Sequence, residues 1–211
     1  MGKNGAKNRQ KKLAKRKAKS RARQKNTRNQ TGGSRTVFGK VVGCSIDDQG
    51  TGIISVTLAR EAGLGFFWVA GFVIDFQCLG VKDSFLSKVT SMQFRAFKEQ
   101  RELVEYFPQK AKRAVLAGVE YAKSIGFEPH KDFTKSFSIF KGIDAEPGDC
   151  EFELGKDGSP LFIAGPFDSP AKCKKILETL EKNCGKGNSR YILTTSEFDE
   201  EAGRYVGSEE F

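Results

Sequence analysis

The chain has 211 residues, 38% of them hydrophobic and 29% charged, and its net charge is +10 at pH 7. A chain of this length is expected to form one domain, or one domain with a tail. No run of residues approaches the roughly 18 consecutive apolar residues of a membrane-spanning helix. The sequence therefore excludes an integral helical membrane protein. A membrane surface is not predicted as a partner either, because the basic segment over residues 3–28 has Leu13 as its only large aliphatic residue.

The charge is unevenly distributed along the chain. Residues 1–40 contain 15 Lys and Arg and no acid, and the first acidic residue is Asp47. Residues 41–211 contain the other 21 basic residues and all 26 acidic ones. A basic arm is thus joined to a mildly acidic body. The arm is not expected to be a secretory signal, because no apolar stretch follows its charges.

The arm and its hinge occupy residues 1–35, ending in Thr31-Gly32-Gly33-Ser34 and Arg35. Basic and small polar residues dominate it, so it cannot bury enough apolar surface to offset its ordering entropy and is expected to be disordered when free. Lys, Arg, Gln and Ala also favour helices, and residues 8–25 could fold on a polyanion.

Nucleic acid is the polyanion that suits the arm best, because each neutralised phosphate releases counterions. The mixture of Arg, Lys, Asn and Gln favours RNA or ribonucleoprotein over DNA. No aromatic residue precedes Phe38, so the arm should contact backbone rather than stack on bases. A weakly binding solvated tail and a nuclear localisation signal are the competing interpretations. The residues expected to bind are Lys11, Lys12, Lys15, Arg16, Lys17, Lys19, Arg21 and Arg23.

The first half of the body reads as strands. Apolar and β-branched runs predict strands over about 36–43, 53–59 and 66–79, with Gly-containing turns between them. The third run is nearly all apolar, so we expect one central strand that is buried on both faces.

Helices are expected next. Residues 90–106 are amphipathic and should end before Pro108, and residues 109–125 predict a second helix with Gly126 after its end. Asp132 could cap a third, short helix rich in phenylalanine.

The last part predicts a hairpin, a helix and a strand. Residues 151–154 and 161–164 flank a Gly-Lys-Asp-Gly turn, which indicates a hairpin. A helix then runs from Ser169 at its N-cap to Gly185, with Leu177 among its expected buried residues. Residues 190–194 form the final strand, and the acidic tail 196–211 is expected to be loose.

This order of elements predicts the α+β class, with helices packed on one face of a largely antiparallel sheet. The expected organisation is an arm over residues 1–35, a single domain over 36–195 and an acidic tail over 196–211.

Catalytic candidates are few. Asp75 interrupts the most apolar segment, where an unpaired carboxylate is costly, so it could lie at a sheet edge, pair with Lys82 or serve a nuclease-like site. The only histidine could be a general base or simply a loop residue. The five widely spaced cysteines do not suggest zinc, and we predict no metal or cofactor. The weak candidates are Asp75, Asp83, Glu120, His130 and Asp132.

Three stretches resemble a family of uncharacterised bacterial proteins. They are Gly71–Asp83 (GFVIDFQCLGVKD), Glu120–His130 (EYAKSIGFEPH), and Phe152–Pro160 (FELGKDGSP) through Gly165-Pro166. The resemblance covers about residues 50–195 and omits the arm. It implies a bacterial cytoplasmic protein, disfavours the nuclear interpretation and assigns no catalytic residue.

Together these features predict a cytoplasmic nucleic-acid-binding protein rather than an enzyme. One alternative is a metal-dependent hydrolase or nuclease with acids near Asp75 and His130. The other is a regulatory module whose body binds a protein partner. A spatial cluster of the five candidate side chains would favour the enzyme, and scattered positions would favour binding. The oligomeric state is left open.

Overall fold

The computed structural model describes residues 36–48, 50–100, 107–166 and 168–193, together with the backbone of three short strands beyond residue 196. The arm over residues 1–35, and with it the prediction of disorder, lies outside the described residues. The chain from Phe38 onward forms one unit. No helix in the described part is long and apolar enough to cross a membrane.

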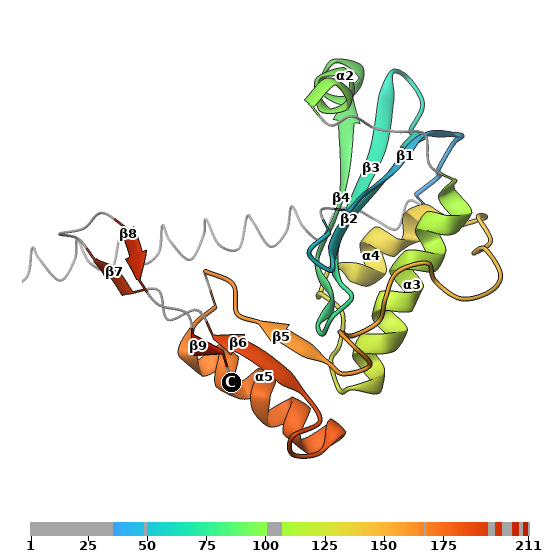
Figure 1. Ribbon diagram of the computed structural model, residues 1–211. Coiled ribbons are helices and arrows are strands. Elements are labelled where there is room, and N and C mark those ends of the chain that lie inside the picture. Colours follow the sequence, from blue (N-terminus) through green and yellow to red (C-terminus); the bar gives the residue numbers. More distant parts are fainter. Residues whose placement is uncertain are drawn as a thin grey trace, which may run out of the picture. The chain divides into compact units, whose positions relative to one another are not determined.

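Four strands form an antiparallel sheet in which each strand pairs with its neighbour in the sequence (Figure 1). They are β1 (Val41–Asp48), β2 (Ile53–Glu61), β3 (Phe66–Asp75) and β4 (Gly80–Thr90). Together with the helices, this sheet confirms the predicted α+β class.

Two helical segments cover one face of the sheet (Figure 1): α3 (Pro108–Ser124), and α4 (Phe133–Phe137) with the 3-10 turn η1 (Ser138–Phe140). α3 lies very close to the sheet, because a Cβ added to Gly118 would come within 2.4 Å of Ile74 Cγ2. Apolar residues from β1 to β4, α3 and η1 form the first core.

Helix α2 (Ser91–Gln100) packs at one end of the opposite face. The alternation of side chains along β3 points Phe67 and Val69 away from the first core, and the ring of Phe67 stacks on Phe94 with centroids 4.5 Å apart. The helix predicted over 90–106 is therefore observed over its first part, and residues 101–106 are outside the described residues. The helix predicted over 109–125 is confirmed as α3, and Gly126 follows it with φ +95°.

The prediction of one strand over 66–79 is wrong. β3 ends at Asp75, the chain turns through residues 76–79, and β4 returns from Gly80, where φ is +62°. The turn misled the sequence analysis because Phe76 and Cys78 are both buried. A turn made of mostly apolar residues has the same composition as a buried strand, so the sequence does not distinguish the two.

The hairpin predicted from residues 151–154 and 161–164 is also wrong. Only β5 (Leu161–Ile163) is a strand, and it pairs in parallel with β6 (Arg190–Leu193). The β3–β4 turn takes the backbone groups that a hairpin would use, since Gly155 N–H donates to Phe76 O at 2.8 Å and Leu161 N–H to Gln77 O at 3.0 Å.

Helix α5 (Pro170–Cys184) begins and ends as predicted. Ser169 Oγ accepts the Lys172 N–H, and Gly185 follows the last turn with φ +87°. Its buried residues belong to a second core, which also contains Cys78 from the β3–β4 turn and Phe162 from β5. Leu177 is only partly buried, contrary to the prediction, whereas Leu180 is fully buried.

One smaller expectation is also wrong, because Asp132 makes no side-chain capping bond to α4. Beyond residue 196 the backbone contributes β7 (Glu197–Asp199), β8 (Arg204–Val206) and β9 (Glu209–Glu210), of which β9 pairs with β6.

Candidate functional site

The five catalytic candidates do not form one cluster. Asp75 lies buried beside the β3–β4 turn, Glu120 is on the exposed side of α3, and Asp83 and His130 meet at β4. In the described part of the chain, no three His, Cys, Asp or Glu side chains are placed to hold a metal ion. Asp83, His130 and Asp132 are neighbours, whereas Asp75 and Glu120 each have other partners.

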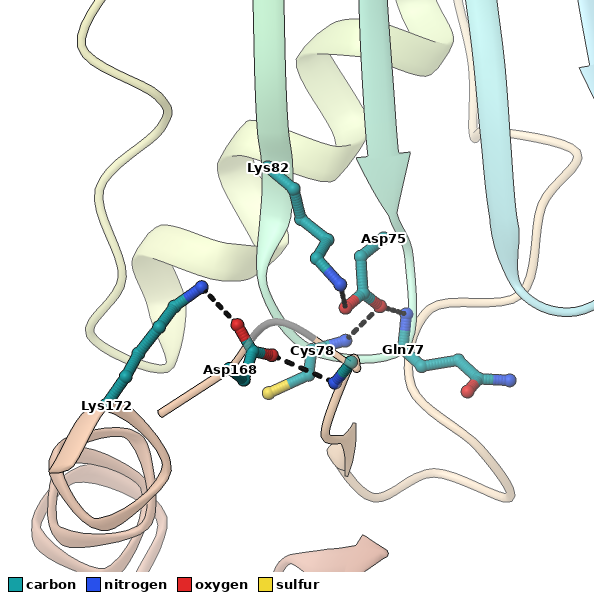
Figure 2. Close-up of polar contacts among 7 residues, drawn as sticks. Asp75, Gln77, Cys78, Lys82, Asp168 and Lys172 are labelled. Carbon is teal, nitrogen blue, oxygen red and sulfur yellow. Dashed lines mark hydrogen bonds and ion pairs between the residues drawn. The ribbon is translucent and has the colours of Figure 1, made fainter. Parts of the chain in front are cut away.

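The Asp75 side chain organises the β3–β4 turn (Figure 2). Its Oδ1 accepts the N–H groups of Gln77 and Cys78, each at 3.0 Å, and its Oδ2 lies 3.9 Å from Lys82 Nζ. Asp75 is only 5% exposed. Burial raises the pKa of this carboxyl, and Lys82 and the backbone N–H groups only partly counteract that effect. The carboxylate thus has a structural role in the turn.

Lys82 reaches Asp75 because β4 contains a bulge. Ile74 pairs with Val81 and Val73 pairs with Asp83, which leaves Lys82 without a partner on β3. A bulge of this kind redirects a side chain, and Figure 2 shows Lys82 pointing towards Asp75. Of the three sequence interpretations of Asp75, the pair with Lys82 is the observed contact.

A second carboxylate, Asp168, closes the loop before α5 (Figure 2). Its Oδ2 accepts the Gly165 N–H at 3.0 Å, and its Oδ1 lies 2.5 Å from Lys172 Nζ. Partial burial raises the pKa of Asp168, but the bonds from Lys172 and Gly165, with the charge of Lys82, outweigh it and the net pKa is lowered. The Gly165 N–H therefore has its hydrogen-bond acceptor within the chain.

His130 is held in a local pair. Its Nδ1 lies 3.7 Å from Asp83 Oδ1 and also accepts the Asp132 N–H at 3.4 Å. A ring nitrogen that accepts a bond from an amide carries no proton to donate to a carboxylate, so Nδ1 serves one partner at a time. Glu120 pairs instead with Arg113 at 3.4 Å.

The eight basic residues predicted to bind nucleic acid lie in the arm, outside the described residues. The described body nevertheless carries a group of cations and aromatic rings at one end of the sheet. Strand pairing places Arg60, Trp68 and Lys88 side by side on β2, β3 and β4. Two rings flank them, and we call the set the aromatic–cation row: Phe38, Arg60, Phe66, Trp68 and Lys88.

The rings and cations of the row touch one another. Lys88 Nζ lies 4.8 Å from the Phe66 ring centroid and 5.9 Å from that of Trp68. The rings of Phe38 and Trp68 meet edge to face at 6.0 Å. Arg60 Cζ lies 5.6 Å from the Phe38 ring centroid. These distances are those of cation–π and aromatic pairs.

Arg60 is the fixed member of the row. Its guanidinium donates to Gly39 O at 2.8 Å, Ile139 O at 3.0 Å and Lys141 O at 2.7 Å. Lys88 is exposed and forms none of the ion pairs found among the described residues. The row therefore combines an anchored cation with one that faces solvent.

The strand expected over residues 66–79, buried on both faces, would place Phe66, Phe67 and Trp68 in the core, and only rings left exposed could stack on bases or meet a protein partner. In the structure only Phe67 points to the α2 side, while Phe66 is 39% exposed and Trp68 is half-buried. The period of two within a strand could have separated these rings. Lys88 could not have been placed beside these rings, because it lies on β4, which was not predicted.

Comparison with known proteins gives no match to a family model, a curated protein or a solved structure. The chemistry of the chain's own residues is therefore the basis for a functional proposal.

Proposed function

We propose that this protein binds nucleic acid, RNA in preference to DNA, through its basic arm. The observation that carries the proposal is the charge of the arm, which has 13 basic residues and no acid between residues 3 and 28. Phosphate contacts by such a segment provide affinity that depends on charge number and salt rather than on sequence. The catalytic candidates of the described body do not form one cluster, which supports binding over a reaction. We further expect a cytoplasmic location, where its five free cysteines would stay reduced.

A salt titration tests the proposal. If about six arm residues contact duplex phosphates, the logarithm of the affinity should fall with the logarithm of salt concentration at a slope of roughly −5, and less steeply on single strands. The test variant is the full chain with Lys11, Lys12 and Lys15 replaced by Gln. It should bind more weakly to all sequences, with a slope smaller by about 2–3.

The matched control carries the same three changes on the exposed face of α5, at Lys174, Lys175 and Lys182. It alters the net charge equally and should leave both affinity and slope close to those of the unmodified protein. Equal effects of the two triple variants, or no effect of the arm variant, would overturn the proposal. Metal-dependent cleavage of RNA that is lost in a folded Asp75→Asn variant would replace it with the enzyme interpretation.

A further inference from the structure

We propose that the aromatic–cation row is a stacking site for unpaired bases, so that the nucleic acid is held as a single strand where it crosses the sheet. This inference rests on the proposed function and names the ligand class. The arm has no aromatic residue before Phe38, so it can neutralise phosphates but cannot stack on bases. The rings of the aromatic–cation row can provide the base stacking that the arm cannot.

The composition of the row is that of a single-strand binding surface. Such surfaces combine aromatic rings, on which successive bases stack, with cations that follow the backbone. Phe66 retains exposed surface although Lys88 lies over its ring. Lys88 can turn from the ring to a phosphate, because a lysine ammonium is a point charge on a flexible stem. A duplex offers no open base face to these rings.

The first ring of the row lies close to the arm in the sequence. The arm ends at Arg35, and Phe38, the first ring of the row, follows three residues later. At the other end of the row, the turn before Phe66 presents Leu64, which is 99% exposed and held at φ +52° between two glycines of positive φ. The turn next to Phe66 thus adds an exposed apolar side chain.

The charge of the row also fits an anionic ligand. Arg60 and Lys88 flank Trp68 on the same sheet face, because directly paired residues of neighbouring strands share a face. The neighbouring acid, Glu61, pairs with Phe67 and points to the opposite face. The two cations therefore flank the central ring without an acidic side chain between them in the strand register.

The only tryptophan of the chain is Trp68, so its fluorescence reports on the row directly. The experiment titrates the full-length protein with a single-stranded uridine 12-mer and, separately, with an RNA duplex of equal length. Stacking predicts quenching of Trp68 by the single strand and little change with the duplex. Phe66→Ala should weaken single-strand binding by about 5- to 100-fold and duplex binding by less than about 2-fold.

Phe85→Ala is the matched control. Phe85 is 43% exposed, similar to Phe66, but it lies across Gly71 on the opposite sheet face, so its removal should leave RNA binding unchanged. Lys88→Gln keeps every ring and should lower the salt slope by about 1. It also tests the row if the Phe66 variant fails to fold.

Two failures can be told apart. Salt-sensitive RNA binding without Trp68 quenching, or equal losses in Phe66→Ala and Phe85→Ala, would overturn the stacking site and leave the proposed function in place. No binding of either RNA would overturn both.

Discussion

Replacing Asp75 with alanine should lower the stability of the protein. We expect this loss because the carboxylate holds the β3–β4 turn together, and not because it takes part in a reaction. The change removes the acceptor for two backbone N–H groups, and that of Cys78 is fully buried. A buried donor left without a partner costs about 1–3 kcal/mol. The Gln77 N–H can reach water more easily, and Lys82 loses its partner, so we expect a total loss of about 2–4 kcal/mol.

Asp75→Asn is the discriminating variant, because its amide oxygen can still accept both N–H groups. It should lower the free energy of unfolding by less than about 1 kcal/mol, as measured by urea denaturation. Equal losses in the alanine and asparagine variants, or a loss below about 0.5 kcal/mol for alanine, would refute the structural role of the carboxylate.

The pH dependence offers a second measurement on the same residue. Burial raises the pKa of Asp75 in the folded protein above its ordinary value of about 3.9. The stability that comes from the favoured protonated form is then full below about pH 4 and is lost as pH rises through the folded pKa. The stability of the unmodified protein relative to Asp75→Asn should fall from about pH 4 to pH 7. A constant or rising difference would contradict this assignment.

Three other predictions concern packing and the histidine. Gly118→Ala should lower the free energy of unfolding by about 1–2 kcal/mol, because the cost of overpacking against the sheet exceeds the gain in helix propensity. Thermal or urea unfolding measures this change. The control, Glu120→Ala on the exposed side of α3, should change the same free energy by no more than about 0.5 kcal/mol. Leu180→Ala should cost about 2–5 kcal/mol and clearly more than Leu177→Ala, and the opposite order would show that α5 packs through another face. His130→Ala should change unfolding by less than about 1 kcal/mol and leave RNA affinity intact, because its carboxylate partner is exposed.

The parts of the fold that could be predicted are those set by local rules. Helix α5 was found at both ends, since Ser169, Pro170 and Gly185 act on their own backbone neighbours. The strand predicted over 53–59 was found as β2, because its alternation and the turn residues beside it are local signals. The first strand was predicted over 36–43, whereas β1 runs over Val41–Asp48, so its bounds were wrong. The α+β class followed from the order of these elements.

The parts that could not be predicted depend on distant contacts. The end of β3 was missed because the buried turn over residues 76–79 continues its apolar run, which only Asp75 and Gln77 interrupt. β4 lies beyond that run, over Gly80–Thr90, and no strand was predicted there. The parallel pairing of β5 with β6 depends on residues almost thirty positions apart. For the candidate site, the sequence showed the charge of the arm and the aromatic run Phe66-Phe67-Trp68. It could not show that Lys88 lies beside Trp68, because that contact depends on the pairing of β3 with β4.

The β3–β4 turn has a consequence for how the chain folds. Phe76 belongs to the first core and Cys78 to the second, so four residues join both. The four-stranded sheet forms through short connections between sequence neighbours, and such local contacts close quickly. The second core can form only after the β3–β4 turn has formed, because Cys78 from that turn is one of the buried residues of the second core. We therefore expect the sheet to form first and the segment from β5 to β6 to dock onto it later. During synthesis, β1 to β4 also leave the ribosome before β5 and α5, so the order of emergence matches this order of assembly.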